Sequence, residues 1–331
     1  MEAVEMSFWK DRSVLVTGAT GLVGSALVPR LTRLGARVAA LVRDWDPESE
    51  LIRSRAIDSC RVVSGRLESV EDVERAVVEH EAETVFHLGA QTQVGIGYRS
   101  PYATFETNIR GSYTLFEACR RHADVVARIV VASSDKAYGE SAVLPYTEEM
   151  PARGRHPYDV SKSCTDLLAG CYAQTYELPV VVARCGNIYG GGDLNWNRLI
   201  PGTIRSALAG QRPVIRSDGH YRRDYVYVAD AVDAYLAMAE RIDLPDIRGE
   251  AFNFGPSKSS TVLEVAGAIL RLAGREALEP VIENRARAEI RDQHLDSSKA
   301  GRLLGWEPKW TLETGLTETI DWYRRRLERA P

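Results

Sequence analysis

The stretch VLVTGATGLVGS, residues 14–25, decides the fold of this chain. Its apolar start has the pattern of a buried strand, and Gly18, Gly21 and Gly24 follow directly before a helical stretch. Glycines at such a turn permit a tight bend and let a pyrophosphate approach the helix N-terminus, whose free N–H groups favour anions. The stretch therefore predicts a dinucleotide site, with an ordinary strand–helix turn as the alternative.

Short valine-rich stretches alternate with helical patterns through the first half of the chain. The strand-like stretches are 13–18, 37–42, 61–65, 84–90, 128–133 and 179–184, and the helical ones are 22–34, 70–80, 102–122 and 157–177. Continuous apolar strands suit a parallel sheet that is covered on both faces. The alternation predicts an α/β fold with a Rossmann-type, doubly wound parallel sheet.

The pattern changes after Arg184. The stretch CGNIYGGGDLNWNRLIPG (185–202) is rich in Gly and Asn and predicts a long functional loop. Mixed helices and strands follow it and predict a smaller C-terminal α+β domain that binds substrate. We assign residues 1–185 to the NAD(P)-binding domain and 186–331 to the smaller domain, with a boundary that the chain can cross more than once.

The composition argues against several classes of binding partner. A net charge of −4 over 331 residues gives no broad basic face, which argues against nucleic acid. No apolar run approaches the roughly 20 residues that span a bilayer, and the N-terminus does not have the pattern of a secretory signal. The five cysteines include no CxxC pair, so we expect no metal site, no disulfide framework and a reducing cytoplasm.

The end of the second strand, VAALVRDWD (38–46), bears on the choice of dinucleotide. NAD sites usually have an acidic residue there for the ribose 2′-hydroxyl, whereas an arginine accommodates the 2′-phosphate of NADP. Arg43 slightly favours NADP as the cofactor. Asp44, one position later, means that NAD stays an alternative. A solvated surface charge is the alternative role for Arg43.

Two further stretches carry groups that can move protons. VVASSDKAYG (130–139) ends a strand with Ser134, Asp135 and Lys136, and HPYDVSK (156–162) places Tyr158 and Lys162 on one helix face. A nearby ammonium lowers the pKa of a phenol and makes the phenolate a usable base. Because strand C-termini line the ligand crevice of a doubly wound sheet, we expect these groups to lie together. A solvated polar turn is the alternative for residues 134–136.

The motifs taken together resemble one family. The chain is similar to the extended short-chain dehydrogenase/reductase family over essentially its whole length, through TGATGLVGS, HLGAQ, TNIRGS, SSDKAYG, PYDVSK, RCGNIYGGGD, RDYVYVAD and LDSSKAGRLLGW. Within it, the chain resembles the nucleotide-sugar 4,6-dehydratase branch. FWKDRSVLVTG, SSDK and GGGDLNWNRLIP are similar to stretches of the CDP-glucose 4,6-dehydratases.

The resemblance implies a role for each catalytic candidate. Tyr158 would take the proton of the sugar 4-hydroxyl, Lys162 would hold Tyr158 and the nicotinamide ribose, and Ser134 would bind the 4-oxygen. Asp135 and Lys136 would be the acid and base of water elimination, and which of the two acts at C5 stays open. A 4-epimerase, which needs no such pair, is the alternative enzyme, and a non-catalytic NADP-binding sensor is the alternative from another class.

The resemblance also implies binding residues. Tightly held NAD(P) would contact Gly18, Gly21, Leu22, Val23, Gly24, Arg43, Leu67, Leu88, Tyr158 and Lys162. The pyrophosphate of a nucleotide sugar would contact Asn187, Arg198, Arg223 and Arg287, because arginine forks suit phosphate oxygens. The chain departs from the family in having Arg66 in place of an adenine-contacting Asp and Gly89 in place of Ala, while Asn108 would brace the active-site helix.

The family further implies a homodimer through the helices near 102–122 and 157–177. Leu115, Phe116, Leu167 and Leu168 are the apolar residues expected to supply its buried face.

Overall fold

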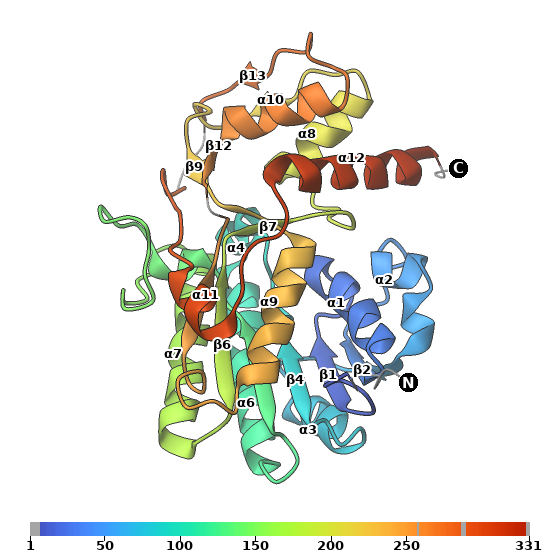
Figure 1. Cartoon of the computed structure of the whole chain (residues 1–331), viewed down its shortest axis with the longest axis vertical. Helices are drawn as coiled ribbons and strands as arrows, with labels where there is room; N and C mark the ends of the chain where they lie inside the picture. The colour runs from blue at the N-terminus through green and yellow to red at the C-terminus, as the bar shows by residue number, and fades with distance from the viewer. Residues whose placement is uncertain (1–6, 257, 286–288, 329–331) are drawn as a thin grey trace, which may run out of the picture.

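A parallel sheet of seven strands organises the molecule, of which the computed structural model describes residues 7–256, 258–285 and 289–328. Its strand order is β11-β6-β5-β4-β1-β2-β3, and every neighbouring pair is parallel. Figure 1 labels β1, β2, β4 and β6 among these strands. The strands are β1 (Ser13–Thr17), β2 (Arg37–Val42), β3 (Arg61–Ser64), β4 (Thr84–His87), β5 (Arg128–Ala132), β6 (Val180–Cys185) and β11 (Ala251–Phe254). Because the order reverses between β1 and β4, this is the predicted doubly wound Rossmann-type sheet.

Helices cover both faces of the sheet. Alternate residues of β1 point to opposite faces, so Val14 and Val16 join one core cluster and Leu15 joins the other. The first cluster packs under α1 (Leu22–Arg33), α9 (Val228–Arg241) and α11 (Ser298–Leu304). The second packs under α3 (Val70–Val78), α6 (Gly111–Arg121) and α7 (Pro157–Tyr176). Both faces are therefore apolar, which explains the continuous valine-rich strands.

Local sequence signals account for where several helices begin. The Ser69 hydroxyl accepts a hydrogen bond from the Asp72 N–H at 3.2 Å at the start of α3. Pro157 opens α7, where its fixed φ suits the first helical position. Thr261 and Glu264 form a capping box at the start of α10 (Val262–Leu272).

The long helix expected over 102–122 is three consecutive segments. α5 (Pro101–Phe105) leads through a π-helical turn, Glu106–Arg110, into α6. Such turns often lie at functional sites. The remaining short segments before the large loop are α2 (Glu50–Arg53), α4 (Val94–Arg99) and the 3₁₀ turns Ala56–Ser59 and Asp135–Tyr138.

The chain returns to the sheet after residue 185. α9 packs on α1, and β11 pairs with β6 so that Phe252 lies beside Ala183. The Rossmann sheet thus includes elements from the C-terminal part of the chain, a crossing that the proposed boundary at residue 185 allowed.

A smaller lobe lies beyond the carboxyl ends of the sheet strands (Figure 1). α8 (Leu199–Leu208), α10 and α12 (Leu312–Glu328) enclose its core, which includes Ile204, Ile269 and Ile320. Three small sheets complete it: β7 (Asn187–Tyr189) with β10 (Tyr225–Tyr227), β9 (Arg222–Arg223) with β12 (Ser260–Thr261), and β8 (Val214–Ile215) with β13 (Val281–Ile282).

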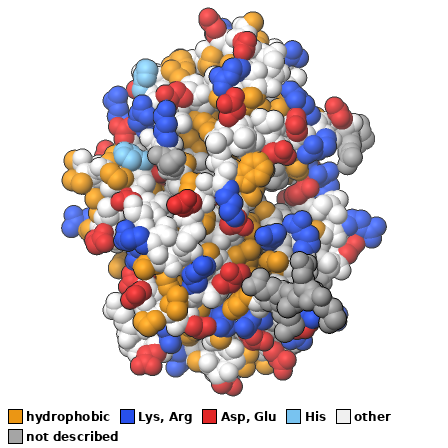
Figure 2. All heavy atoms as spheres, viewed as in Figure 1, with side chains coloured by type: hydrophobic (Ala, Val, Ile, Leu, Met, Phe, Trp, Pro, Cys, Tyr) orange, Lys and Arg blue, Asp and Glu red, His pale blue; other side chains and the backbone are white. Residues whose placement is uncertain are grey.

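The burial of two residues differs from what was expected for the dimer face. Leu115 and Phe116 are fully buried against the sheet, so they cannot form a second, intermolecular face. Leu167 is exposed as expected, and Leu168 is only partly buried. Figure 2 shows acidic and basic side chains interspersed over the face that it draws, without a broad basic area there.

Candidate active site

The loop between β1 and α1 has a geometry that only glycine allows. Gly18 has a φ of +67°, and a Cβ on Gly24 would lie 2.3 Å from the Gly18 carbonyl oxygen. Gly21 is the N-cap of α1 and offers no side chain to the first N–H groups of the helix. These groups stay available for an anion, so a dinucleotide pyrophosphate fits this cradle.

One cavity of about 830 Å³ joins this loop to the other predicted site residues. Its wall contains all the predicted cofactor-binding residues: Gly18, Gly21, Leu22, Val23, Gly24, Arg43, Leu67, Leu88, Tyr158 and Lys162. It also contains Ser134, Lys136, Asn187, Arg198 and Arg223. Asp135 is buried behind this wall and is not part of it. Arg287, the remaining predicted residue, lies outside the described residues.

The turn after β5 presents two of its three polar side chains to the cavity. Ser134 Oγ accepts a hydrogen bond from the Lys136 backbone N–H at 3.2 Å and donates to Asp135 Oδ1 at 3.0 Å. Asp135 is 2% exposed, and its Oδ2 has no partner among the described residues. Ser134 and Lys136 can therefore reach a ligand in the cavity directly, whereas Asp135 acts from behind Ser134.

Tyr158 and Lys162 lie one turn apart on α7, and both face the cavity. The Lys162 amine donates a hydrogen bond to the Ala132 carbonyl at 2.7 Å, and burial lowers its pKa to about 8. Burial raises the pKa of the Tyr158 phenol, which a hydrogen bond with Ser134 partly offsets. The Tyr158 and Ser134 side chains thus lie near one another and line the same cavity.

The Lys136 amine is surrounded by charges from several elements. It donates a hydrogen bond to Gln293 Oε1, and burial together with Arg223 lowers its pKa. Asp135, Asp159 and Glu289 act in the opposite direction. A lysine whose pKa is lowered in this way is more readily available as a neutral base.

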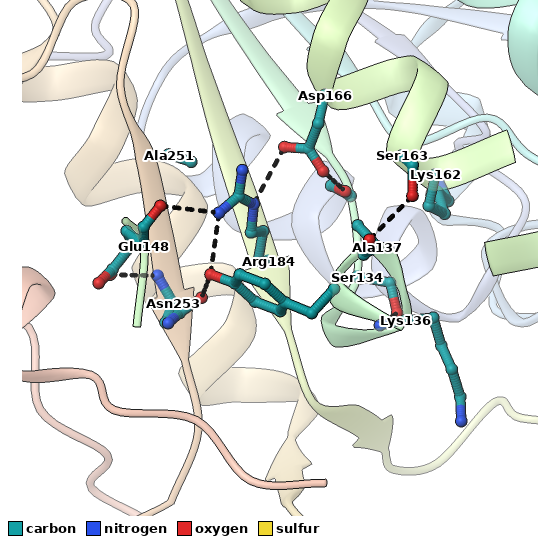
Figure 3. Close-up of polar contacts among 12 residues, drawn as sticks. Ser134, Lys136, Ala137, Glu148, Lys162, Ser163, Asp166, Arg184, Ala251 and Asn253 are labelled. Carbon is teal, nitrogen blue, oxygen red and sulfur yellow. Dashed lines mark hydrogen bonds and ion pairs between the residues drawn. The ribbon is translucent and has the colours of Figure 1, made fainter. Parts of the chain in front are cut away.

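Beneath this turn lies a buried polar network (Figure 3). Asp166 on α7 accepts from the Ser133 hydroxyl at 2.5 Å and pairs with Arg184 on β6. Arg184 also donates to the Tyr138 hydroxyl at 2.9 Å. In Figure 3 the Lys136 side chain points away from this network, as expected for a residue directed into the cavity.

The outer end of the dinucleotide cradle holds the residues that bear on cofactor choice. Arg43 and Asp44 both line the cavity and form an exposed ion pair, with Nε 2.6 Å from Oδ2. Leu67 lines it as predicted, while Arg66 is exposed and is not in the wall. A Cβ on Gly89 would lie 2.7 Å from Leu67 Cδ1, so the glycine makes room for this leucine.

The two described arginines at the substrate side are held by carbonyl and carboxylate groups. Arg198 donates to Asp193 Oδ2 and to the Ile188 carbonyl, both at 2.6 Å. Arg223 donates to the carbonyls of Ile290 and Arg291. Both guanidinium groups are therefore fixed in orientation beside the cavity, an arrangement that suits the binding of phosphate oxygens.

Asn108 lies in the π-helical turn and braces the active-site helix. Its Nδ2 donates to Ser161 Oγ on α7 at 2.9 Å, and its Oδ1 accepts from the Gln91 N–H at 2.7 Å. It thereby joins α7 to the chain that follows β4.

Sequence reasoning missed two residues that face Lys136. Asp159 lines the cavity and lies inside the motif PYDVSK, so its carboxylate could have been noticed beside Tyr158. Gln293 gave no signal, because it lies in an irregular segment with no recognisable motif and 157 positions from Lys136. Only the folded chain brings these residues together.

The described part of the chain lacks two features that would bear on its partners. It contains no group of three or more His, Cys, Asp or Glu residues placed to hold a metal ion. None of its helices combines the length and the apolar character needed to cross a membrane.

Comparisons with known proteins agree with the fold and the cavity. Residues 14–255 match the NAD dependent epimerase/dehydratase family. The CDP-glucose 4,6-dehydratase of Salmonella typhimurium is 30% identical over 97% of this chain and 93% of its own length. Among solved structures, the UDP-glucose 4-epimerase of Thermotoga maritima with UDP-glucose is 32% identical, with a TM-score of 0.87 over 95% of this chain and 99% of that one. The dTDP-glucose 4,6-dehydratase of Bacillus anthracis in complex with NAD is 27% identical, with a TM-score of 0.84 over 96% of this chain and 98% of that one.

The chain therefore belongs to the NAD dependent epimerase/dehydratase family of extended short-chain dehydrogenases/reductases. It is an enzyme, and its cofactor is a nicotinamide dinucleotide, for which the glycine cradle is built. The predicted fold class and family are confirmed.

Proposed function

We propose that the protein is a nucleotide-sugar 4,6-dehydratase, which converts an NDP-hexose into an NDP-4-keto-6-deoxyhexose. The observation that carries this proposal is that Lys136 is in the wall of the cavity that also contains Tyr158 and Lys162. A 4-epimerase needs a proton acceptor at the 4-hydroxyl but no second base at C5. The relative named as a CDP-glucose 4,6-dehydratase supports the same assignment.

The groups that act at C4 are Ser134, Tyr158 and Lys162. The Ser134 hydroxyl binds the 4-oxygen, and Tyr158, as the general base, takes the proton of the 4-hydroxyl. When bound, the nicotinamide would supply the hydride acceptor and donor. Lys162 would hold the ribose of that cofactor, and its positive charge would favour the Tyr158 phenolate.

Lys136 then acts at C5. The 4-ketone makes the C5 proton acidic, and the neutral Lys136 amine takes this proton while hydroxide leaves C6 with a proton to form water. The leaving group needs a carboxyl donor, and two are near. Asp135 reaches the cavity only through Ser134, whereas Asp159 lines it, and burial raises the pKa of Asp159. A raised pKa favours the protonated form that can donate.

The substrate and cofactor follow from the cavity wall and from the relatives. Arg198 and Arg223 would bind the pyrophosphate of the nucleotide, with CDP-glucose as the first candidate substrate because of the Salmonella relative. Arg43 gives NADP a slight preference over NAD, because its guanidinium can exchange Asp44 for a 2′-phosphate. Thermal shifts with NAD and NADP, for the wild type and for Arg43→Ala, test this preference.

The proposed activity is tested by incubating the protein and NAD(P) with CDP-, GDP-, dTDP- and UDP-hexoses. The expected product of one of them is lighter by one water. A 4-epimerase remains the second candidate, because a solved UDP-glucose 4-epimerase matches this fold with a TM-score of 0.87. It would yield an isomer of unchanged mass. Binding of NADP without any turnover would instead indicate a sensor.

The enzyme is further proposed to be a cytoplasmic homodimer. Tyr102 on α5, Tyr113 on α6 and Leu167 on α7 are exposed large apolar residues, at 75%, 41% and 65%. A partner copy that pairs these helices would bury them. None of the five cysteines is in a disulfide, as is usual in a reducing compartment. A monomer by light scattering at micromolar concentration would refute the dimer.

A further inference from the structure

Residues 290–296, called the strap below, form an irregular segment that is fixed from two sides. On one side the Gln293 N–H donates to the Arg222 carbonyl at 3.1 Å, and the Leu295 N–H donates to Asp224 Oδ2 at 2.8 Å. On the other side the Asp296 N–H donates to the Tyr146 carbonyl at 2.9 Å. The strap therefore has a defined position relative to the cavity.

Gln293 is the residue of the strap that reaches the proposed C5 base. Its side chain is fully buried, and its Oε1 accepts a hydrogen bond from Lys136 Nζ. The acceptor is an amide oxygen, which carries no net charge. Its Nε2 has no hydrogen-bond partner among the described residues, although the Tyr146 hydroxyl also lies near this side chain. The bond from the Lys136 amine therefore satisfies the amide oxygen of this polar side chain in the interior.

The other groups that face Lys136 are charged and come from different elements. Arg223 on β9 disfavours the ammonium form, while Asp135 beside Lys136, Asp159 on α7 and Glu289 before the strap favour it. The effects of Arg223 and of the three carboxylates on the amine are opposed. A further carboxylate in contact with the amine would therefore favour its protonated form. Gln293 occupies that contact with a neutral group.

We propose that Gln293 is a positioning residue for Lys136: its amide oxygen orients the amine in the cavity without fixing a proton on it. This inference rests on the proposed dehydratase function. One N–H of the neutral Lys136 amine donates to Gln293, and the lone pair of the same nitrogen remains available to take the C5 proton. The electrons of the C5–H bond then form the C5–C6 double bond as the C6–O bond breaks, and hydroxide leaves with a proton as water.

The test that does not depend on turnover is the pH dependence of amine acylation. The whole protein is treated with a trace of acetic anhydride at several pH values, and acetylation of Lys136 and Lys162 is read by peptide mass. Gln293→Glu should move the midpoint for Lys136 upward by about one to three pH units, since an adjacent opposite charge favours the ammonium. The midpoint for Lys162 should stay in place. Gln211→Glu, the same change at an exposed position, should move neither.

Turnover supplies the second readout. In Gln293→Glu the acidic limb of the kcat/KM profile should move to higher pH, because the neutral amine then exists only above the raised pKa. Gln293→Met keeps the length but removes the acceptor, and it should lower kcat at least tenfold with little change in KM. An unmoved Lys136 midpoint in folded Gln293→Glu, or normal kcat in Gln293→Met, would overturn the assignment. If the wild type removes no water from any nucleotide sugar while the midpoint still shifts, the dehydratase function fails and the contact with Lys136 stands.

Discussion

Arg184 Nε lies 3.1 Å from Asp166 Oδ1, in an ion pair that joins β6 to α7 beneath the turn after β5. The two side chains are 10% and 4% exposed. Through Ser133 and Tyr138 the pair contacts both ends of that turn, which carries Ser134 and Lys136 between them. The position of the proposed catalytic turn therefore depends on a buried charge pair outside the cavity.

Removing one partner of this pair should be strongly destabilising. Arg184→Met leaves the Asp166 carboxylate buried without its guanidinium, and we expect a loss of about 3–5 kcal/mol in the free energy of unfolding. Urea denaturation measures it. Asp58→Asn breaks an exposed pair with Arg55 and should cost less than about 1 kcal/mol. Similar losses in the two variants would show that the buried pair has no special role.

Tyr158→Phe should keep the binding of cofactor and nucleotide sugar but lose most turnover. The change deletes only the hydroxyl, and loss of a general base typically costs about 10²–10⁴-fold in rate. Steady-state kinetics and a thermal shift with ligands measure the two effects. Tyr176→Phe, on an exposed part of the same helix, is the matched control. Near-normal turnover of Tyr158→Phe would remove this hydroxyl from the chemistry.

Asp159 and Asp135 can be separated as donors to the leaving water. Asp159 lines the cavity and Asp135 does not, so Asp159→Asn should slow water loss by about 10²-fold or more. Asp135→Asn should have a smaller effect, because Asn can still accept from Ser134. Product formation followed by mass compares the two. If Asp135→Asn slows water loss more than Asp159→Asn does, Asp135 is the acid, as the sequence indicated.

The carboxyl of Asp224 should make stability depend on pH. Burial raises its pKa to about 7, and its Oδ1 has no partner among the described residues. The folded state thus binds the proton more tightly than the unfolded state does, so this contribution to stability is present below about pH 4 and is lost as the pH rises through about 7. As the pH rises from 4 to 8, the free energy of unfolding of Asp224→Asn should therefore increase relative to that of the wild type, by up to about 4 kcal/mol. Urea denaturation at the two pH values measures it, with the exposed Asp124→Asn as control, and an unchanged difference would contradict the account.

The sheet and the dinucleotide loop could be predicted from the sequence because their signals are local. The valine-rich strands and Gly18, Gly21 and Gly24 each reflect a backbone or burial requirement of the segment in which they occur. The spacing of Tyr158 and Lys162 was likewise visible, since both lie on one helix.

What could not be predicted depends on tertiary contacts. Asp135 and Lys136 are adjacent in the sequence, yet the 3₁₀ turn directs one into the interior and the other into the cavity. Leu115 and Phe116 were expected on a dimer face because a helical pattern does not tell which buried face is internal. Gln293 meets Lys136 only because the strap packs between β9 and Tyr146.

The central claim is that the Lys136 amine removes the C5 proton so that water leaves. A nucleotide sugar deuterated at C4, identified as substrate in the panel, tests it most directly. The account predicts a product lighter by one water with the deuterium on C6, and in D₂O a further deuterium at C5. Lys136→Met should still allow oxidation at C4, so that reduced cofactor accumulates, but should form this product at least 100-fold more slowly, as removal of a general base requires. Return of the deuterium to C4 without loss of water, or normal turnover in Lys136→Met, would contradict the claim.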